Sequence, residues 1–177
     1  MSFTPPPVAD VLAAIADHFG PLETSVFRGQ TRLVVPEQQS LELLAFLKDQ
    51  GFNLLVDVSC VDYLEYRDPP MQMRASAGHR YGLIYLLCST TTNQRLTIRV
   101  FVDDPEPTVR SVVSLWEAAN WLEREVWDLF GIRFTGHPDL RRLVMPEEFT
   151  AHPLRKDYPL QGRGERHNFP VITRENS

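Results

Sequence analysis

Three acidic residues close together are the first candidates for chemistry. Glu123, Glu125 and Asp128 lie in a segment whose spacing of apolar residues predicts a helix. On that helix Glu125 and Asp128 share one face, whereas Glu123 lies about 200° round from Glu125. An apolar face around Glu125 would raise the pKa of its carboxyl, which suits a general acid. The pattern therefore allows a stand-alone acid–base enzyme that uses Glu125 and Asp128.

The same carboxylates also have cationic neighbours, which favours a structural role. Arg124 and Asp128 are four residues apart and can pair on the flank of the helix. We expect Glu125 to be buried and paired with an arginine. The candidate partners are Arg124, Arg141, Arg142 and Arg155. The sequence has no GxSxG, HExxH or GKS/T motif to supply an activated nucleophile or a phosphate loop, so we favour ion pairs over catalysis.

Two similar motifs follow this helix. Each begins with a His-Pro pair, at residues 137–138 and 152–153, and continues with a leucine and two cations. Proline pre-sets an extended path, leucine can enter an apolar pocket, and arginine can bind a carboxylate through two hydrogen bonds. The histidines do not have the spacing of metal ligands, and no cysteine lies near them. The motifs therefore predict a segment that docks on a partner.

Composition narrows the class of protein further. The chain has 177 residues, 18 basic and 23 acidic, so its formal charge is 18 − 23 = −5, which argues against a nucleic-acid binder. No apolar stretch is long enough to span a bilayer, and the N-terminus does not resemble a secretory signal. We therefore expect the chain in the cytosol unless a partner holds it elsewhere. Cys60 and Cys88 lie in apolar runs and are expected to be free, buried thiols.

The elements that must position these residues form an α+β pattern. Apolar residues recur at helical spacing in some segments and alternate in others, with Gly29-Gln30 between two short strands as a hairpin turn. The predicted helices span 8–19, 37–50 and 111–130, and the predicted strands span 23–28, 31–35, 52–64, 81–89 and 95–102. The order α-β-β-α-β-β-β-α predicts a two-layer domain with helices on one face of a mixed, mostly antiparallel sheet of about five strands. A bulge is expected in the long strand 52–64, and a break near Ala119-Asn120 in the last helix.

The C-terminal stretch differs from the rest of the chain. Residues 1–131 carry 10 − 17 = −7 charges and residues 132–177 carry 8 − 6 = +2, with no convincing helix beyond Gly131. Ordering such a segment costs about 1–2 kcal/mol per residue, more than its apolar side chains return on burial. We therefore predict an α+β domain, 1–131, and an extended, irregular, partner-binding tail, 132–177, whose backbone groups find their partners on another protein.

Taken together, these motifs resemble the small peripheral-arm subunit of respiratory complex I, the proton-pumping NADH–quinone oxidoreductase. The resemblance covers nearly the whole chain, although Leu143-Val144 stands where Ile-Leu is more usual. The matching motifs supply the predicted partner-binding residues. These are Glu123, Arg124, Glu125, Asp128, Gly131, His137, Pro138, Leu140, Arg142, His152, Pro153, Leu154, Arg155, Lys156, Asp157 and Tyr158.

The resemblance implies a non-catalytic structural subunit that binds no cofactor or metal of its own. FMN, the iron–sulfur clusters and the quinone site would belong to neighbouring subunits, and the tail would run along the large subunit that helps form the quinone site. The chain would then be a peripheral component on the cytoplasmic side of the inner cell membrane, held there by the complex, with no nucleic-acid partner. The nearest alternative is the equivalent subunit of a membrane-bound hydrogenase or of a ferredoxin- or F420-dependent relative.

Overall fold

The structure is a computed structural model that describes residues 8–64, 66 and 78–165. Residues 67–77, between two of the predicted strands, and the last part of the predicted tail, from residue 166, lie outside the described residues. The elements are α1 (Val8–Phe19), β1 (Glu23–Phe27), β2 (Gln30–Val35), α2 (Glu37–Asp49), β3 (Leu54–Asp62), β4 (Tyr81–Cys88), β5 (Arg95–Val102), β6 (Thr108–Arg110), α3 (Ala119–Phe130) and β7 (Arg133–Thr135).

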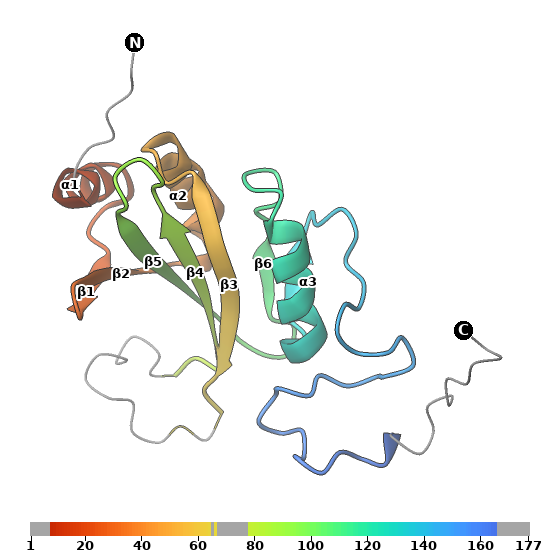
Figure 1. The fold of residues 1–177 in the computed structure, drawn as a ribbon. Coiled ribbons are helices and arrows are strands. Elements are labelled where there is room, and N and C mark those ends of the chain that lie inside the picture. The colour runs from red at the N-terminus through yellow and green to blue at the C-terminus, as the bar shows by residue number, and fades with distance from the viewer. Residues whose placement is uncertain (1–7, 65, 67–77, 166–177) are drawn as a thin grey trace.

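Five strands form the main sheet, in the order β1-β2-β5-β4-β3 (Figure 1). Only β2 and β5 run parallel, and the other three pairs are antiparallel. This confirms the predicted α+β fold with a mixed, mostly antiparallel sheet. The predicted bulge in β3 is present, between Leu55 and Asp57.

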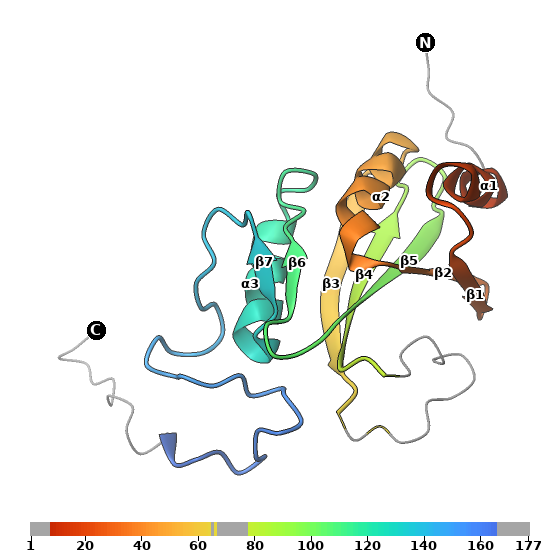
Figure 2. The same ribbon diagram turned by 180° about the vertical axis from the view of Figure 1, so that it is seen from behind.

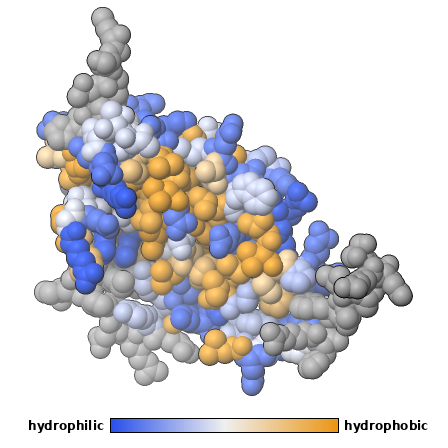
Figure 3. Space-filling model, viewed as in Figure 1, coloured by the Kyte–Doolittle hydropathy of each residue, from blue (hydrophilic) through white to orange (hydrophobic). Residues whose placement is uncertain are grey.

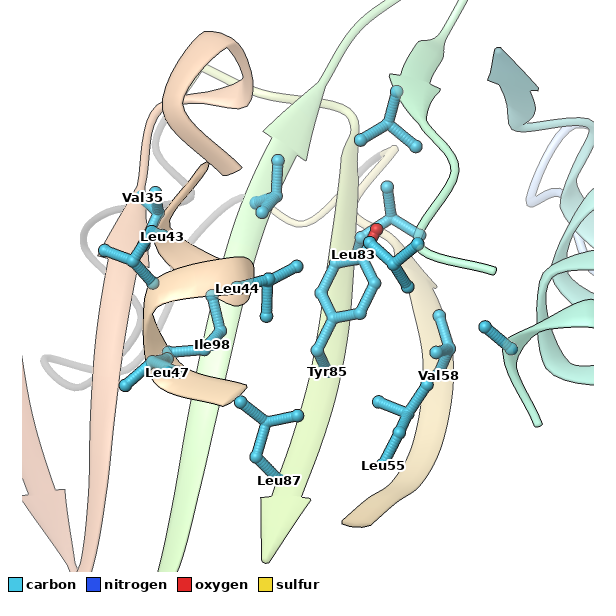
Figure 4. Packing of buried hydrophobic residues seen from close by; sticks show 14 of the residues in the cluster. Val35, Leu43, Leu44, Leu47, Leu55, Val58, Leu83, Tyr85, Leu87 and Ile98 are labelled. Carbon is cyan, nitrogen blue, oxygen red and sulfur yellow. The ribbon is translucent and has the colours of Figure 1, made fainter. Parts of the chain in front are cut away.

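The core lies between this sheet and α2. Leu43, Leu44 and Leu47 of α2 are fully buried, and they pack toward Tyr85 and Ile98 on the facing side of the sheet (Figure 4). Seen from behind, α2 lies in front of the strands (Figure 2). Apolar residues at helical spacing on α2 and at alternate positions on β4 and β5 make this packing possible. Both cysteines are buried and free, as predicted.

The last helix is shorter than predicted, because α3 begins at Ala119 and not near residue 111. The preceding stretch contains β6, which pairs in parallel with β7 in a second, two-stranded sheet. The expectation that every regular element precedes residue 132 is therefore wrong. Strands of three residues carry too little alternation to be recognised in a sequence, and these two form because they pair with each other.

The beginning of the tail belongs to the core. Ile132 and Phe134 are 0% and 2% exposed, and they join the same apolar cluster as Val126 and Phe130 of α3. This cluster extends to α3 beside the edge strand β3, in the arrangement seen in Figure 1. The helix that carries the predicted site thus packs against both β3 and the β6–β7 pair.

Candidate partner-binding site

Asp128 organises the C-terminal half of the chain. Its side chain is completely buried, and its Oδ2 accepts the backbone N–H groups of Leu143, Val144 and Met145 at 3.0, 2.8 and 2.8 Å. Its Oδ1 accepts a hydrogen bond from Nη1 of Arg142 at 2.5 Å. Burial alone would raise the pKa of Asp128, but these hydrogen bonds more than offset it and the pKa is lowered. Asp128 is therefore an ionised anchor for the tail.

The predicted pair between Arg124 and Asp128 does not form. Arg124 is buried and donates to the carbonyl oxygens of Arg141 and Arg142, at 3.1 and 3.0 Å. It also lies over the ring of Trp121, with 5.2 Å between Cζ and the ring centroid. Both side chains of the expected pair turn toward the tail, where backbone groups need partners, instead of toward each other.

These contacts correct the expectation that the tail finds its backbone partners only on another protein. In the described part of the tail, residues 132–165, backbone groups are bonded to side chains of α3. An extended segment can be held in this way without a sheet or helix of its own, because one buried carboxylate accepts several N–H groups. Such charge-assisted bonds add to apolar burial in offsetting the conformational entropy lost when the tail is ordered.

The two His-Pro motifs contact opposite ends of α3. His137 Nε2 lies 3.1 Å from the carbonyl oxygen of Asn120 in the first turn, and His152 Nδ1 lies 2.9 Å from that of Asp128 near the end. Burial lowers the pKa of His152, and the nearby carbonyl of Asp128 only reduces this effect. The two similar motifs thus make similar contacts: each histidine ring lies against a backbone carbonyl oxygen of the same helix.

The C-terminus of α3 is closed by the second motif. The carbonyl oxygens of Leu129 and Phe130 accept hydrogen bonds from Leu154 N, at 3.0 Å, and from Arg155 Nε, at 2.5 Å. Gly131 ends the helix in a left-handed conformation, with φ of 77°. A Cβ at this position would lie 2.6 Å from His152, so both the backbone angle and the space require glycine.

A second buried carboxylate, which sequence reasoning missed, holds the tail further on. Asp62 at the end of β3 is 4% exposed, pairs with Arg80 at 3.2 Å and accepts the N–H of Lys156 at 2.9 Å. Arg80 also pairs with Asp157 at 3.0 Å and with Asp104. Burial would raise the pKa of Asp62, and its hydrogen bonds lower it overall. The available signal was an aspartate at an inward position of a strand, which needs a partner.

The roles of the two glutamates on α3 are the reverse of the prediction. Glu125 is exposed and makes no ion pair within the described part of the chain, so its predicted burial and arginine partner are wrong. Glu123 is completely buried, with Oε2 2.7 Å from the Ser111 hydroxyl and Oε1 2.7 Å from Val112 N. Burial raises the pKa of Glu123 to about 7, although both hydrogen bonds lower it. The helix is turned so that the face containing Glu123, not Glu125, meets the core.

Apolar side chains of this region divide into an inner and an outer set. Leu140 is half-buried against the chain's own core, whereas Leu154 is 49% exposed, so only the second motif presents its leucine outward. Of the remaining predicted residues, Pro138 is exposed and Pro153 is half-buried. The Tyr158 hydroxyl lies 2.8 Å from Glu165 Oε1. The exposed large apolar residues here are Trp121, Val144, Leu154 and Leu160.

This arrangement does not provide an acid–base pair. The oxygens of Asp128 are occupied by four donors, and Glu125 points into solvent on the flank of the helix. Within residues 8–64, 66 and 78–165, no group of three or more histidine, cysteine, aspartate or glutamate side chains could hold a metal ion. The function of this geometry is structural. Buried charged side chains of α3 and β3 hold the extended tail in one path across the domain.

The fold and the site together define a class of protein. It is an α+β domain whose C-terminal segment is held along its last helix by buried carboxylates and arginines, with apolar side chains directed outward. Comparison with known proteins narrows this class. Residues 33–164 match the family described as "Respiratory-chain NADH dehydrogenase, 30 Kd subunit".

Individual relatives agree with this family. One is the protein designated C among the NADH-quinone oxidoreductase subunits of Geotalea uraniireducens. The chain is 44% identical to it over 142 residues, covering 80% of each chain. The chain is 40% identical over 163 residues to the protein with the same designation from Trichlorobacter lovleyi, covering 89% of this chain and 94% of that one.

Two solved structures extend the comparison. One, described as "Nqo5 of the trypsin-resistant fragment (1-134)", is 37% identical with a TM-score of 0.63, and the match covers 75% of this chain and 98% of that one. A chain of an archaeal membrane-bound sulfane sulfur reductase has a TM-score of 0.73 over 94% of each chain at 19% identity, which shows a shared fold. The protein belongs to the 30-kDa subunit family and is a subunit of an NADH–quinone oxidoreductase complex.

Proposed function

We propose that this chain is a non-catalytic, structural subunit of the peripheral arm of a proton-translocating NADH:quinone oxidoreductase. In this proposal electrons pass from NADH through FMN and iron–sulfur centres to quinone in partner subunits, and this chain binds none of these cofactors. The geometry of the site supports the proposal, because its buried ionisable groups are engaged in hydrogen bonds that hold the tail or, in the case of Glu123, the loop at Ser111. Its partners are then other peripheral-arm subunits, and no nucleic acid is involved.

The observation that carries the proposal is the two-sided character of the tail. Its polar contacts are directed inward, to Asp128 of α3 and Asp62 of β3. Its exposed apolar side chains are directed outward: Val144 is 57% exposed, Leu154 49% and Leu160 108%. A segment that is already fixed to its own domain loses little further freedom on binding, and exposed apolar groups gain most from a partner's surface. We infer that this side of the tail docks on the large subunit that helps form the quinone site.

The predicted partner-binding residues then divide by role. Those whose polar groups are occupied within the chain position the tail and act on the partner indirectly. This set contains Arg124, Asp128, Gly131, His137, Arg142, His152 and Arg155. Glu123 instead binds Ser111 and Val112, and so positions α3 itself. Those that are exposed, above all Leu154 and Lys156, contact the partner directly, as do the exposed Trp121 and Val144.

Attachment to the membrane would come from the complex. None of the helices in the described ranges is both long enough and apolar enough to cross a bilayer. We propose that the protein lies on the cytoplasmic side of the inner cell membrane, where its partners hold it.

The test compares two exposed apolar residues on different parts of the surface. Leu154→Ser should remove an anchor of the tail interface, and losing a central anchor costs about 2 kcal/mol, a roughly thirtyfold fall in affinity. The measurement is the amount of this chain that co-purifies with flavin- and iron–sulfur-containing subunits from membranes. Val26→Ser, at a residue that is 67% exposed on β1, is the matched control and should change little. Normal recovery of the Leu154 variant would contradict the proposed tail interface.

A further inference from the structure

The sheet has a second face, turned away from α1 and α2, which carries a patch of apolar side chains among polar ones such as Arg32, Ser59 and Thr97. In Figure 1 this face points toward the viewer, and Figure 3 shows hydrophobic side chains gathered over it. The strand registers put residues of β2, β3, β4 and β5 side by side here. We call this the outer face, and its half-buried apolar residues are Val34, Val61, Ile84, Leu86 and Phe101.

Arg99 lies in the middle of the outer face. It is directly opposite Ile84 on β4 and Val34 on β2. The neighbours on either side along β5 that share its direction are Thr97 and Phe101. Arg99 is only 9% exposed, and its buried Nε has no hydrogen-bond partner. A largely buried guanidinium thus has apolar residues on both neighbouring strands at the centre of the sheet.

This arginine has no counterion in the described part of the chain. It forms no hydrogen bond or ion pair there, whereas the equally buried Arg124 is bonded to two carbonyl oxygens. Asp57 lies on the same face, opposite Leu86, but does not pair with Arg99. The charge of Arg99 acts on the phenol of Tyr63: burial raises the pKa of Tyr63, and Arg99 only reduces that rise. Only Nε of this guanidinium is fully buried without a partner, so its Nη atoms can be reached from outside. A poorly solvated cation without an anion is unfavourable, which favours a carboxylate supplied by a partner.

We propose that the outer face is a docking surface for a neighbouring subunit of the complex, which places one aspartate or glutamate on Arg99 and apolar side chains around it. The inference rests on the proposed function, and it adds the outer face to the tail interface. The two surfaces adjoin at a hollow lined by Asp57 and Leu154. Arginine donates two parallel hydrogen bonds to a carboxylate, and such a pair is strong when apolar contacts exclude water from it. The centre of an apolar surface is where such an anchor is most effective.

The surroundings of the outer face limit how the partner can lie. An open groove of about 650 Å³ begins where the face ends and shares Val34 and Phe101 with it. The groove is also lined by Glu23 and Glu106, so an acidic segment would be repelled there. The partner's carboxylate therefore belongs at Arg99, and any part of the partner that enters the groove is expected to be neutral or basic.

The first test uses Arg99→Met in the full-length chain, with Arg95→Met as the matched control. Arg95 is an exposed arginine on the same strand and the same face. Arg99→Met should lower the amount of this chain recovered with the complex at least tenfold. It should leave the melting temperature of the isolated full-length chain unchanged or higher, because an unpaired charge has been replaced by an apolar group. Arg95→Met should change neither quantity. Recovery of Arg99→Met at the normal level would overturn the proposal.

A second test does not alter Arg99 and identifies the occupant. A photo-crosslinking phenylalanine analogue replaces Leu86 in the full-length chain, and the assembled complex is irradiated. The expected product joins Leu86 to a different subunit, within a few residues of an aspartate or glutamate. Cross-links only within this chain, to a second copy, or to no protein would each overturn the proposal. The same analogue at Leu154 reports on the tail: a cross-link there without one at Leu86 refutes this inference and leaves the proposed function intact.

Discussion

Glu123 makes the stability of this protein depend on pH. Its pKa in the folded chain is about 7, against an ordinary value of 4.5, because burial disfavours the charged carboxylate. Below pH 4.5 the group is protonated in both states. Between pH 4.5 and 7 the folded state holds a proton that the unfolded chain has lost, so the stabilising effect declines as the pH rises. The difference between these two pKa values corresponds to roughly 3 kcal/mol in the free energy of unfolding.

Glu123→Gln should therefore remove a loss of stability that the parent protein shows on going from pH 5 to pH 8. The measurement is the free energy of unfolding in urea across this range, taken as the difference between the two proteins. Comparing variant with parent is necessary because His152 also makes the stability depend on pH, in the opposite direction. Its pKa is lowered in the folded chain, so its stabilising effect grows as the pH rises toward 6.5. Glu117→Gln, at an exposed residue, is the control. A difference that does not vary with pH would show that Glu123 does not titrate in this range.

Asp128 and Glu125 offer a comparison of a buried and an exposed carboxylate on one helix. Asp128→Ala leaves Arg142 and three backbone N–H groups without their acceptor, and breaking a buried pair costs about 3–5 kcal/mol. Glu125→Ala should cost at most about 0.5 kcal/mol, since surface changes are usually that small. Urea unfolding of the two variants checks this. Similar values for both would mean that the tail is not anchored on Asp128.

At the scale of elements, the junction between α3 and the tail depends on Gly131. Its φ of 77° is left-handed, a conformation that costs a residue with a Cβ about 1–2 kcal/mol. The space that a Cβ would need is also taken by His152 and Arg155. Gly136 has a similar φ of 83°, but nothing lies within 4 Å of a Cβ built there. Gly131→Ala should therefore destabilise the protein more than Gly136→Ala, and the excess measures the clash alone.

The readout for this pair has two parts. Urea unfolding gives the cost of each change, about 1 kcal/mol for Gly136→Ala and more than about 2 kcal/mol for Gly131→Ala. Hydrogen exchange of the Leu154 amide, which is bonded to the Leu129 carbonyl, shows whether the tail has left the helix end. It should speed up only in Gly131→Ala. Equal costs and equal exchange rates would show that the contact of the tail with Gly131 is unimportant.

At the scale of the whole molecule, two truncations test where the folded domain ends. The boundary predicted at residue 131 excludes Ile132 and Phe134, which are almost completely buried. A chain ending at Thr135 keeps both side chains and the β6–β7 pair. It should unfold cooperatively, whereas a chain ending at Gly131 should be less stable by at least about 4 kcal/mol, since removing each large buried side chain costs about 2–5 kcal/mol. Equal stability of the two chains in urea would place the boundary at residue 131 as predicted.

Much of the domain could be predicted from the sequence because its signals are local. The helix over 8–19, the hairpin around Gly29 and the strand 95–102 each carry enough residues for the apolar period to identify the element. The motifs from Glu123 to Tyr158 were specific enough to indicate the family. These patterns depend on residues only a few positions apart, and over that range the sequence alone is enough to predict the local conformation.

Only the tertiary structure decided which charged group lies inside. Glu123 and Glu125 are two residues apart on one helix, and their burial depends on how α3 is turned against β3 and the loop at Ser111. The partners of Asp128 lie 14 to 17 residues further along the chain, and Lys156 lies 94 residues from Asp62. Pairings at such separations are set by the competition of all buried polar groups for donors and acceptors, and no local period encodes the outcome of that competition.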